Sequence, residues 1–487
     1  MRMNGNKQTA QPSHGTVMNS PRVSGLQLML CLLVAAVFGC SRPITEPSLP
    51  VNLPTEFSRS GSVPLPGRWW LSFGDPALNH HIKRALNGNL SIAAAWHRLD
   101  QALADVRKSE SSLKPGLDMD SAVSFSEAGT KGKTSSGQNL SIGLSATYEL
   151  DLWDRIQTLS NAESWEAKAT EADLQAAGIT IAGEVAIAWF RLKERYGQLS
   201  LIGEQIATNQ KTLDLVTVQF RTGKAASADI LQQRQLIEAK QGEKTQVIGD
   251  IDILKHRLAT LLGLPPKDSV TMPTSSLMTV PSLPDTGIPS ALIHRRPDIQ
   301  AAYYRLLAAD QRVAAAVSDR FPKLRLTARG ATAGSYVQDL FRNWLTSISA
   351  GLLGPIIDGQ RRAAEVDRSR SAAFAQLNTY GQIVLNALGE VEDALTRESR
   401  LTALAASLDK QLKLAEQVIL RVKERYTKGI ADYDRVLSAS LSHQQLERSR
   451  LTVQRDLLLN RIALCRSLAG GWEIAQPQSK RVRQTTD

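Results

Sequence analysis

The chain has 487 residues, 42% of them hydrophobic and 22% charged, and its 58 basic against 47 acidic side chains give a formal net charge of +11. This composition is typical of a folded protein and excludes a disordered or collagen-like chain. The basic charge is spread along the chain without a basic patch interleaved with aromatic residues, so we do not expect nucleic acid as a partner.

The N-terminal segment is predicted to be a targeting signal. A basic leader without acidic residues precedes the apolar run Leu26–Phe38, whose thirteen residues are too few to span a bilayer as a helix. Cys40 stands at the end of this run, where it resembles the lipid attachment site of a bacterial lipoprotein. We expect residues 1–39 to be a signal peptide and 40–74 a lipidated tether. The alternative is an ordinary signal peptide with an incidental cysteine.

Four segments are predicted to be strands, because apolar and polar residues alternate along them. They are residues 117–125, 142–150 and 324–328 and a fourth segment around 344–356. Polar loops, 128–138 and 334–343, are expected to join them in two pairs.

Strands with one apolar and one polar face are typical of membrane β-barrels. Four strands cannot close a barrel, and open strand edges are not tolerated in lipid. Several copies of the chain are therefore expected to contribute strands to one barrel. Two copies would give eight strands, and three would give twelve, which is wide enough for a lumen.

Long helices are expected after each pair of strands, because no proline occurs in residues 155–264 or 356–476. Residues 155–222 and 360–428 are predicted to be helices, each roughly 100 Å long at about 1.5 Å per residue. Glycines end both helices, and the chain then folds back in shorter helices. Internal glycines are expected to mark breaks, at Gly183, Gly197, Gly381 and Gly389.

The chain contains an internal repeat. Residues 220–223 correspond to 426–429 at an offset of 206, and each half shows the same order of helix, two strands, long helix and shorter helix. The expected boundaries are 75–263 for the first repeat, 264–290 for a linker, 291–471 for the second repeat and 472–487 for a C-terminal tail.

Candidate catalytic and metal-binding residues do not cluster in the sequence. The histidines form no metal-binding motif, and residues 132–134, which resemble the end of a phosphate-binding loop, lie between two predicted strands. Cys465 shares a helix face with Leu458 and Ile462 and is predicted to pack as a small hydrophobic residue. We therefore expect no metal, no cofactor and no enzymatic activity.

Further motifs are RWWLSFGDP at 68–76, LLGLPP at 261–266, HRRPDIQAA at 294–302 and LGPIIDGQR at 353–361. With the cysteine at position 40, they resemble those of the outer-membrane efflux proteins, the TolC-like, NodT-type outer membrane factors of tripartite pumps. The resemblance covers nearly the whole chain. Two of the motifs also place a proline at a first helical position, Asp75-Pro76 and Arg296-Pro297-Asp298, and so predict helix starts.

The resemblance implies a mixed α/β membrane protein in the outer membrane of a Gram-negative bacterium. A homotrimer would form a twelve-stranded β-barrel, four strands per chain, continued by a long α-helical barrel in the periplasm. Such a protein is the exit duct of a tripartite efflux pump and passively exports small molecules such as drugs or toxic compounds. Its implied partners are a periplasmic adaptor, an inner-membrane pump and outer-membrane lipid.

The turns at Gly223-Lys224 and Gly429-Ile430 are expected to form the tips that dock to the adaptor, because they join antiparallel helices at the end remote from the strands. Just beyond the second turn, an apolar stripe is expected to pack on neighbouring helices. It consists of Ile430, Tyr433, Leu437 and Leu441.

A polar stripe beside it, which contains Asp434, Arg435 and Ser438, is expected to face the lumen. The resemblance places the constricting residues, commonly acidic, at Arg435 and Ser438. Pairing of Asp434 with Arg435 between neighbouring chains would then hold a periplasmic gate shut. The alternative is that both are solvated surface charges.

Three other functions stay open at the level of sequence. A conduit for type I protein secretion would share the same architecture. A lipid-anchored periplasmic coiled-coil protein would lack a channel. A secreted or periplasmic enzyme would need a catalytic or metal-binding constellation that the sequence does not display.

Overall fold

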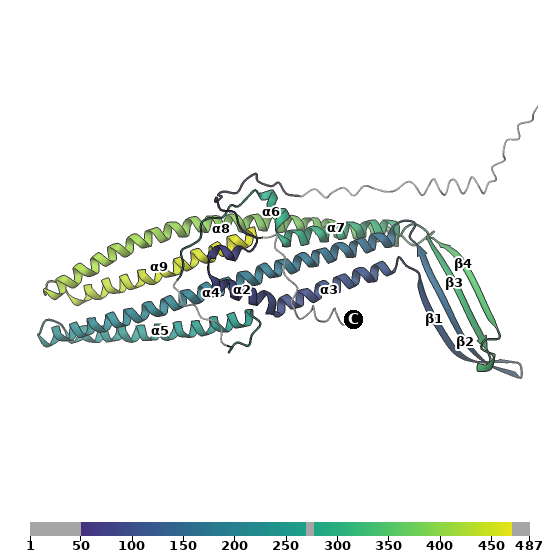
Figure 1. Ribbon diagram of the computed structural model, residues 1–487, viewed down its shortest axis with the longest axis horizontal. Helices are drawn as coiled ribbons and strands as arrows, with labels where there is room; N and C mark the ends of the chain where they lie inside the picture. The colour runs from purple at the N-terminus through teal and green to yellow at the C-terminus, as the bar shows by residue number, and fades with distance from the viewer. Residues whose placement is uncertain (1–49, 269–276, 470–487) are drawn as a thin grey trace, which may run out of the picture. The chain divides into compact units, whose positions relative to one another are not determined.

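The structure is a computed structural model that describes residues 50–268 and 277–469 (Figure 1). The expected signal peptide (1–39), the expected lipid site Cys40 and the C-terminal tail (472–487) lie outside the described residues, as does part of the 264–290 linker. Within the described ranges, no helix is both long and apolar enough to cross a membrane.

The chain folds as two halves with the same order of α-helices and β-strands. The first half comprises η1 (Trp69–Phe73), α2 (Pro76–Gly88), α3 (Leu90–Ser111), β1 (Gly116–Thr130), β2 (Lys133–Leu150), α4 (Arg155–Arg221) and α5 (Ser227–Leu261). The second half comprises α6 (Pro289–Arg295), α7 (Pro297–Ser318), β3 (Lys323–Gly334), η2 (Val337–Asp339), β4 (Trp344–Leu353), α8 (Arg361–Thr427) and α9 (Tyr433–Leu468).

This arrangement confirms the internal repeat. The helices α4 and α8 have 67 residues each, and α3 and α7 have 22 each. A residue with positive φ stands just before each long helix, Asp154 at 54° and Gln360 at 68°, so the corner from strand to helix is built alike in both halves. Both long helices end within one residue of the predicted positions.

The four strands form one antiparallel sheet in the order β1-β2-β3-β4, which leaves β1 and β4 as its edges. Residues that pair across the strands share a face, and one face is apolar across the whole sheet. Its members include Leu117, Met119 and Val123 of β1, Leu140, Leu144 and Tyr148 of β2, Leu324 and Leu326 of β3, and Ile348 and Leu352 of β4.

The predicted 128–138 loop is wrong. β1 and β2 pair as far as Thr130 and Lys133, so the connection is only Lys131 and Gly132, both with positive φ. A two-residue turn of this kind matches the twist of the flanking strands. Most of the glycine, serine and lysine residues that suggested a loop stand in the strands, because ladder hydrogen bonds come from the backbone and need no apolar side chains. The loop predicted at 334–343 is confirmed, and it contains η2.

The predicted breaks at internal glycines are also wrong, because α4 and α8 run through them without interruption. Two of these glycines allow a close approach between helices instead. A Cβ at Gly183 would lie 2.3 Å from Cδ of Arg466, and one at Gly197 would lie 3.0 Å from a methyl group of Leu451. These glycines of α4 therefore bring α9 close to its surface.

Residues 50–74, the described part of the expected tether, pack against the helices. Phe57 is buried beside Tyr380 and Val384 of α8, and the amide of Ser58 donates to Oε1 of Glu392 at 2.9 Å. Further along, the amide of Gly61 donates to the carbonyl of Pro284 in the linker, and Val63 forms a bridge with the same residue. The tether and the linker are thus joined by main-chain contacts.

The main core lies where η1 and α2 pack against α4, α5 and α9. Trp69, Phe73 and Leu78 are fully buried there with Phe190 of α4, and the ring centroids of Phe73 and Phe190 are 5.3 Å apart. Each of these side chains contributes about 1.5–3 kcal/mol through its burial. The short helices near the N-terminus are therefore an integral part of the helical body.

Asp75 joins the start of α2 to this core. Its Oδ1 accepts hydrogen bonds from the amides of Ala77 and Leu78 at 3.0 and 3.1 Å, so Asp75 is the N-cap of α2, and the helix starts where the sequence predicts. Its Oδ2 accepts from Nε1 of Trp189 at 2.9 Å and from Nζ of Lys193 at 2.8 Å. Burial by itself raises the pKa of Asp75, but these hydrogen bonds outweigh it and hold the pKa below its ordinary value.

Asp75→Asn is expected to destabilise the protein by about 3–5 kcal/mol, because it removes the carboxylate that pairs with the buried ammonium of Lys193. A carboxyl group whose pKa is lowered by folding stabilises the folded state above its ordinary pKa. That contribution is lost as the pH falls through the lowered value. In thermal unfolding followed by circular dichroism, the midpoint of Asp75→Asn should lie below that of the wild type at neutral pH. The difference between the two midpoints should become smaller in acid.

The exposed Asp105 of α3 gives the matched control Asp105→Asn, which should unfold like wild type. Equal thermal unfolding midpoints for Asp75→Asn and this control at neutral pH would contradict the stabilising role of the Asp75–Lys193 ion pair.

Candidate functional site

Two helix-to-helix turns lie at the end of the long helices remote from the sheet (Figure 1). α4 turns into α5 at Gly223 and α8 turns into α9 at Gly429, with φ angles of +74° and +73° that favour glycine. The amides of Lys224 and Ile430 donate to carbonyls five residues earlier, at 2.8 and 2.9 Å, and so close both helices alike. All four predicted tip residues are exposed.

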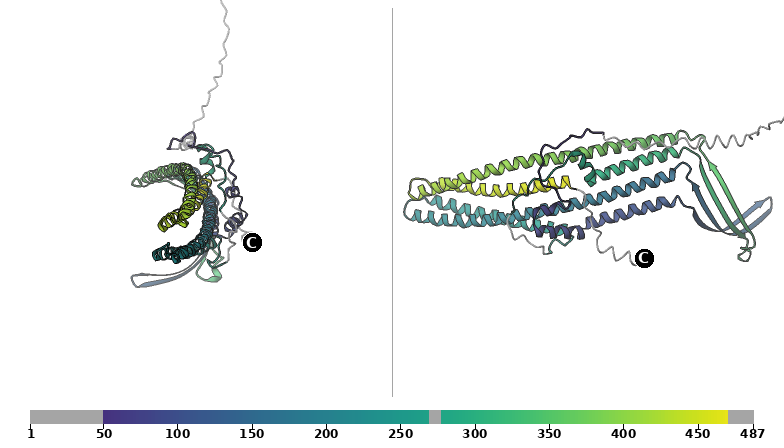
Figure 2. Two further views of the ribbon diagram at one scale, coloured as in Figure 1. Left: turned by 90° about the vertical axis from the view of Figure 1, so that its left-hand side faces the viewer. Right: turned by 45° about the horizontal axis from the view of Figure 1, so that its top comes forward.

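The long helices lie side by side along an arc when the structure is viewed from the tip end (Figure 2). A small apolar cluster supports the two turns, with Val216 of α4, Tyr426 of α8, and Tyr433 and Val436 of α9 buried against one another. Phe220 corresponds to Tyr426 in the repeat, yet it is 44% exposed whereas Tyr426 is 5% exposed. The two turns therefore differ in the surfaces they present.

The predicted gate residues Asp434, Arg435 and Ser438 are all exposed on α9. Among the described residues, neither charged side chain forms an ion pair within its own chain. Both are therefore available to groups outside the chain.

Within one chain, the apolar stripe predicted at the start of α9 is only partly covered. Tyr433 is buried and Leu437 is half-buried, but Ile430 and Leu441 are 62% and 41% exposed. The buried face of α9 runs through Tyr433, Val436, Ser440 and Gln444 instead. This face includes polar residues because polar side chains of α9 bond to polar side chains of α4 and α5.

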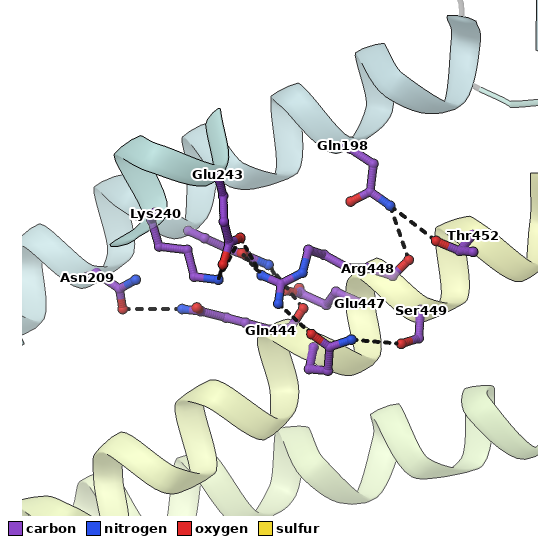
Figure 3. A network of polar contacts seen from close by, with 11 residues as sticks. Gln198, Asn209, Lys240, Glu243, Gln444, Glu447, Arg448, Ser449 and Thr452 are labelled. Carbon is purple, nitrogen blue, oxygen red and sulfur yellow. Dashed lines mark hydrogen bonds and ion pairs between the residues drawn. The ribbon is translucent and has the colours of Figure 1, made fainter. Parts of the chain in front are cut away.

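A band of polar side chains joins α4, α5 and α9 (Figure 3). Nη1 of Arg448 on α9 donates to Oε2 of Glu243 on α5 at 3.1 Å and to Oε1 of Gln205 on α4 at 3.3 Å. Nε2 of Gln205 donates to Glu447 at 3.1 Å, and Nζ of Lys240 donates to Glu243 at 2.9 Å. The band links the hairpin of the first repeat to that of the second.

Nearer the tips, Gln233 of α5 is buried between α4 and α9. Its Nε2 donates to the carbonyl of Asn209 at 2.7 Å, and its Oε1 accepts from the hydroxyl of Tyr433. Nε2 of Gln444 donates to Oδ1 of Asn209 at 3.2 Å. Burial raises the pKa of Tyr433, so its hydroxyl keeps its proton and remains a donor.

This polar band is not among the features predicted from the sequence, although α4 contains a signal for it. Gln198, Gln205 and Asn209 lie on the same helix face as Ile202 and Val216, at spacings of three, four and seven residues. Polar residues at such core positions of a helical seam specify which partner and register the helix takes.

The face of the sheet opposite the apolar one carries charged residues. Nη2 of Arg329 on β3 lies 3.2 Å from Oδ2 of Asp120 on β1, although β2 runs between these two strands. A Cβ at Gly143 of β2 would lie 2.8 Å from Oδ1 of Asp120. The glycine thus leaves room for an ion pair that crosses the middle strand.

No group of three His, Cys, Asp or Glu side chains in the described ranges is placed to hold a metal ion. Cys465 is buried with Leu458 and Ile462, as predicted. Burial raises the pKa of its thiol to about 12, so the thiol stays protonated and unreactive.

The chain matches the family model described as outer membrane efflux protein over residues 81–264 and 288–470. It is 28% identical to the cation efflux system protein CusC of Escherichia coli O6:H1, over 93% of this chain and 100% of that protein. It is also 28% identical to the pyoverdine export outer membrane protein OpmQ of Pseudomonas putida, over 92% and 98%. A crystal structure of CusC matches with a TM-score of 0.81 and 26% identity, over 88% of this chain and 99% of that one.

Gln233→Ala is expected to destabilise the tip end of the helices by about 1–3 kcal/mol, because it removes the partner of the buried Tyr433 hydroxyl and of the Asn209 carbonyl. The neighbouring Gln232 is exposed, so Gln232→Ala is the matched control and should change stability by less than about 0.5 kcal/mol. Amide hydrogen exchange near the tips of α5 and α9 measures the difference. Equal exchange in the two variants would contradict the role of Gln233.

Proposed function

Because the chain belongs to the outer membrane efflux protein family, we propose that it is the outer-membrane exit duct of a tripartite efflux pump. One observation carries this proposal. Each chain has a four-stranded sheet with an apolar face at one end of its long helices and two exposed turns at the other. A sheet placed in a membrane would let the 67 residues of α4 reach roughly 100 Å into the periplasm, at about 1.5 Å per residue.

Three copies complete the duct in this proposal. β1 and β4 are edge strands, and their outer backbone groups need partners inside a membrane. Joining β1 of one copy to β4 of the next supplies those partners. Three copies give twelve strands and a lumen, whereas eight strands enclose a space that side chains fill.

We propose that the duct itself is passive and catalyses no reaction. A periplasmic adaptor would dock at the tips, and an inner-membrane pump would supply the energy. CusC is named for cation efflux and OpmQ for pyoverdine export, and the chain is equally similar to both. We therefore assign the cargo only as small molecules and place its selection in the pump.

The proposed gate lies at the tip end of the duct, at Asp434, Arg435 and Ser438. Asp434 of one copy would pair with Arg435 of the next and hold the end closed. An exposed ion pair contributes about 0–1 kcal/mol, so three pairs favour a closed state that an adaptor is still able to open.

Cys40 is the proposed lipid anchor. Metabolic labelling with an alkyne fatty acid should tag the wild-type protein and leave Cys40→Ser unlabelled. The only other cysteine beyond the expected signal peptide, Cys465, is buried, so it does not compete for the label. Equal labelling of the two proteins would refute the anchor.

Cysteines placed at Lys224 or Ile430 are expected to crosslink to a periplasmic adaptor, because both residues are exposed at the tips. A cysteine at Lys131, in the β1–β2 turn at the far end of the sheet, is the control and should not react with an adaptor. Crosslinks that form only from Lys131 would place the adaptor elsewhere and contradict the proposed orientation.

The double substitution Asp434→Ala with Arg435→Ala is expected to raise single-channel conductance in planar bilayers, because it removes the charges proposed to hold the gate shut. Trimer yield should not change, since both residues are exposed. Lys413→Ala with Glu416→Ala removes one basic and one acidic exposed residue from α8 and serves as the control. Unchanged conductance in the first variant, with normal trimers, would move the gate to other residues.

A further inference from the structure

The two tips carry more basic than acidic side chains. Residues 219–230 and 421–435, which contain the turns and the adjoining helix ends, hold seven lysines and arginines against four aspartates and glutamates. We refer to these two segments as the tip surface. The excess is three charges per chain, so three copies would present nine around one ring.

Half of the acidic groups on the tip surface are already engaged within the chain. Oδ2 of Asp229 accepts a hydrogen bond from the amide of Ala226 at 3.0 Å and caps the start of α5. Glu424 lies 2.7 Å from Nζ of Lys428 and 3.8 Å from Nη1 of Arg421. The same contacts of Glu424 also engage Lys428 and Arg421, so the excess of three basic charges is unchanged by this pairing.

Local structure accounts for only some of the basic residues. Arg221 and Arg425 stand in the last turns of α4 and α8, where a positive charge complements the helix dipole. Lys224 follows the helix-ending glycine, is exposed, and forms no ion pair with the described part of the chain. Its charge is thus available to a group outside the chain.

Exposed apolar side chains lie among these charges. Ile430 is 62% exposed and Phe220 is 44% exposed, and each is within four residues of Lys224 or Lys428. Apolar side chains surrounded by charged ones are typical of protein docking surfaces, in which the apolar groups anchor and the charges orient.

We infer that the adaptor docking on this tip surface presents an acidic apex, with aspartate or glutamate side chains around apolar ones. The inference rests on the proposed function, since it concerns the partner of the same tips. Charge complementarity speeds encounter and excludes partners with a basic apex, and both effects weaken as salt screens the charges. The tips would thereby select among the adaptors of one cell.

The test uses trimers of the full-length protein in lipid nanodiscs and the purified adaptor that crosslinks to Lys224 or Ile430. Lys224→Glu with Lys428→Glu is expected to weaken binding at least about tenfold at about 0.05 M salt. The difference should nearly vanish at about 1 M salt, where the screening length is only about 3 Å. Lys224→Arg with Lys428→Arg should bind like wild type.

Lys410→Glu with Lys413→Glu is the matched control. Both lysines are exposed on α8, and Lys413 lies roughly 22 Å from Lys428 along the helix at about 1.5 Å per residue. That distance exceeds the screening length at either salt concentration, so this variant should bind like wild type. Since Lys428 pairs with Glu424, the single variant Lys224→Glu provides a second test without loss of an ion pair.

Several outcomes would overturn the inference. One is equal affinity for the tip variant and the α8 control, and another is an adaptor that crosslinks at the tips but carries a basic apex. Failure of every adaptor to crosslink at either turn contradicts the proposed docking as well. Replacing the acidic apex residues of the adaptor by lysine should restore binding to the Lys224→Glu, Lys428→Glu trimer.

Discussion

The open edges of the four-stranded sheet constrain the rest of the structure. β1 and β4 each have one side without a neighbouring strand, and the sheet has an apolar face suited to hydrocarbon. Backbone groups left without hydrogen-bond partners in lipid cost several kcal/mol each, so a single sheet is not stable there. Neighbouring copies supply the missing partners, and the helices that leave the strands must then stand side by side as well. The need to pair the edge strands thus accounts for the assembly of both the β-sheets and the long helices.

The two halves share a backbone but not their side chains. Asp154 and Gln360 turn the chain alike at the starts of α4 and α8, and Gly223 and Gly429 end these helices alike. At the tips, however, an exposed Phe220 stands where the other half has a buried Tyr426. The polar band around Arg448 joins α9 of the second half to α4 and α5 of the first half. The repeat therefore sets the architecture, while the differences between the halves create distinct surfaces.

Much of the fold could be predicted from the sequence because it depends on local signals. Proline-free stretches, the glycines at 223 and 429 and strand alternation placed α4, α8 and most of the sheet. The errors arose where neighbouring elements decide the outcome. The serine-rich start of β2 is a strand because β1 pairs with it, and α4 continues through Gly183, whose missing side chain leaves room for Arg466. The tip residues could be located from the sequence. The buried polar face of α9 could not, because it depends on contacts with α4 and α5, and the hydropathy pattern of α9 does not show which helices pack against it.

Disulfide scanning between the two edge strands tests whether β1 of one copy joins β4 of the next. A cysteine at Met119 of β1, on the apolar face, is combined in one chain with a cysteine at each position of 345–351 in β4, and the cells are oxidised. If three copies join through these edges, disulfide bonds should form between different chains and give a covalent ladder that ends at three copies. Reaction should occur at every second position of β4, because alternate side chains share a face. A ladder that ends at two copies, or bonds only within one chain, would contradict this assembly.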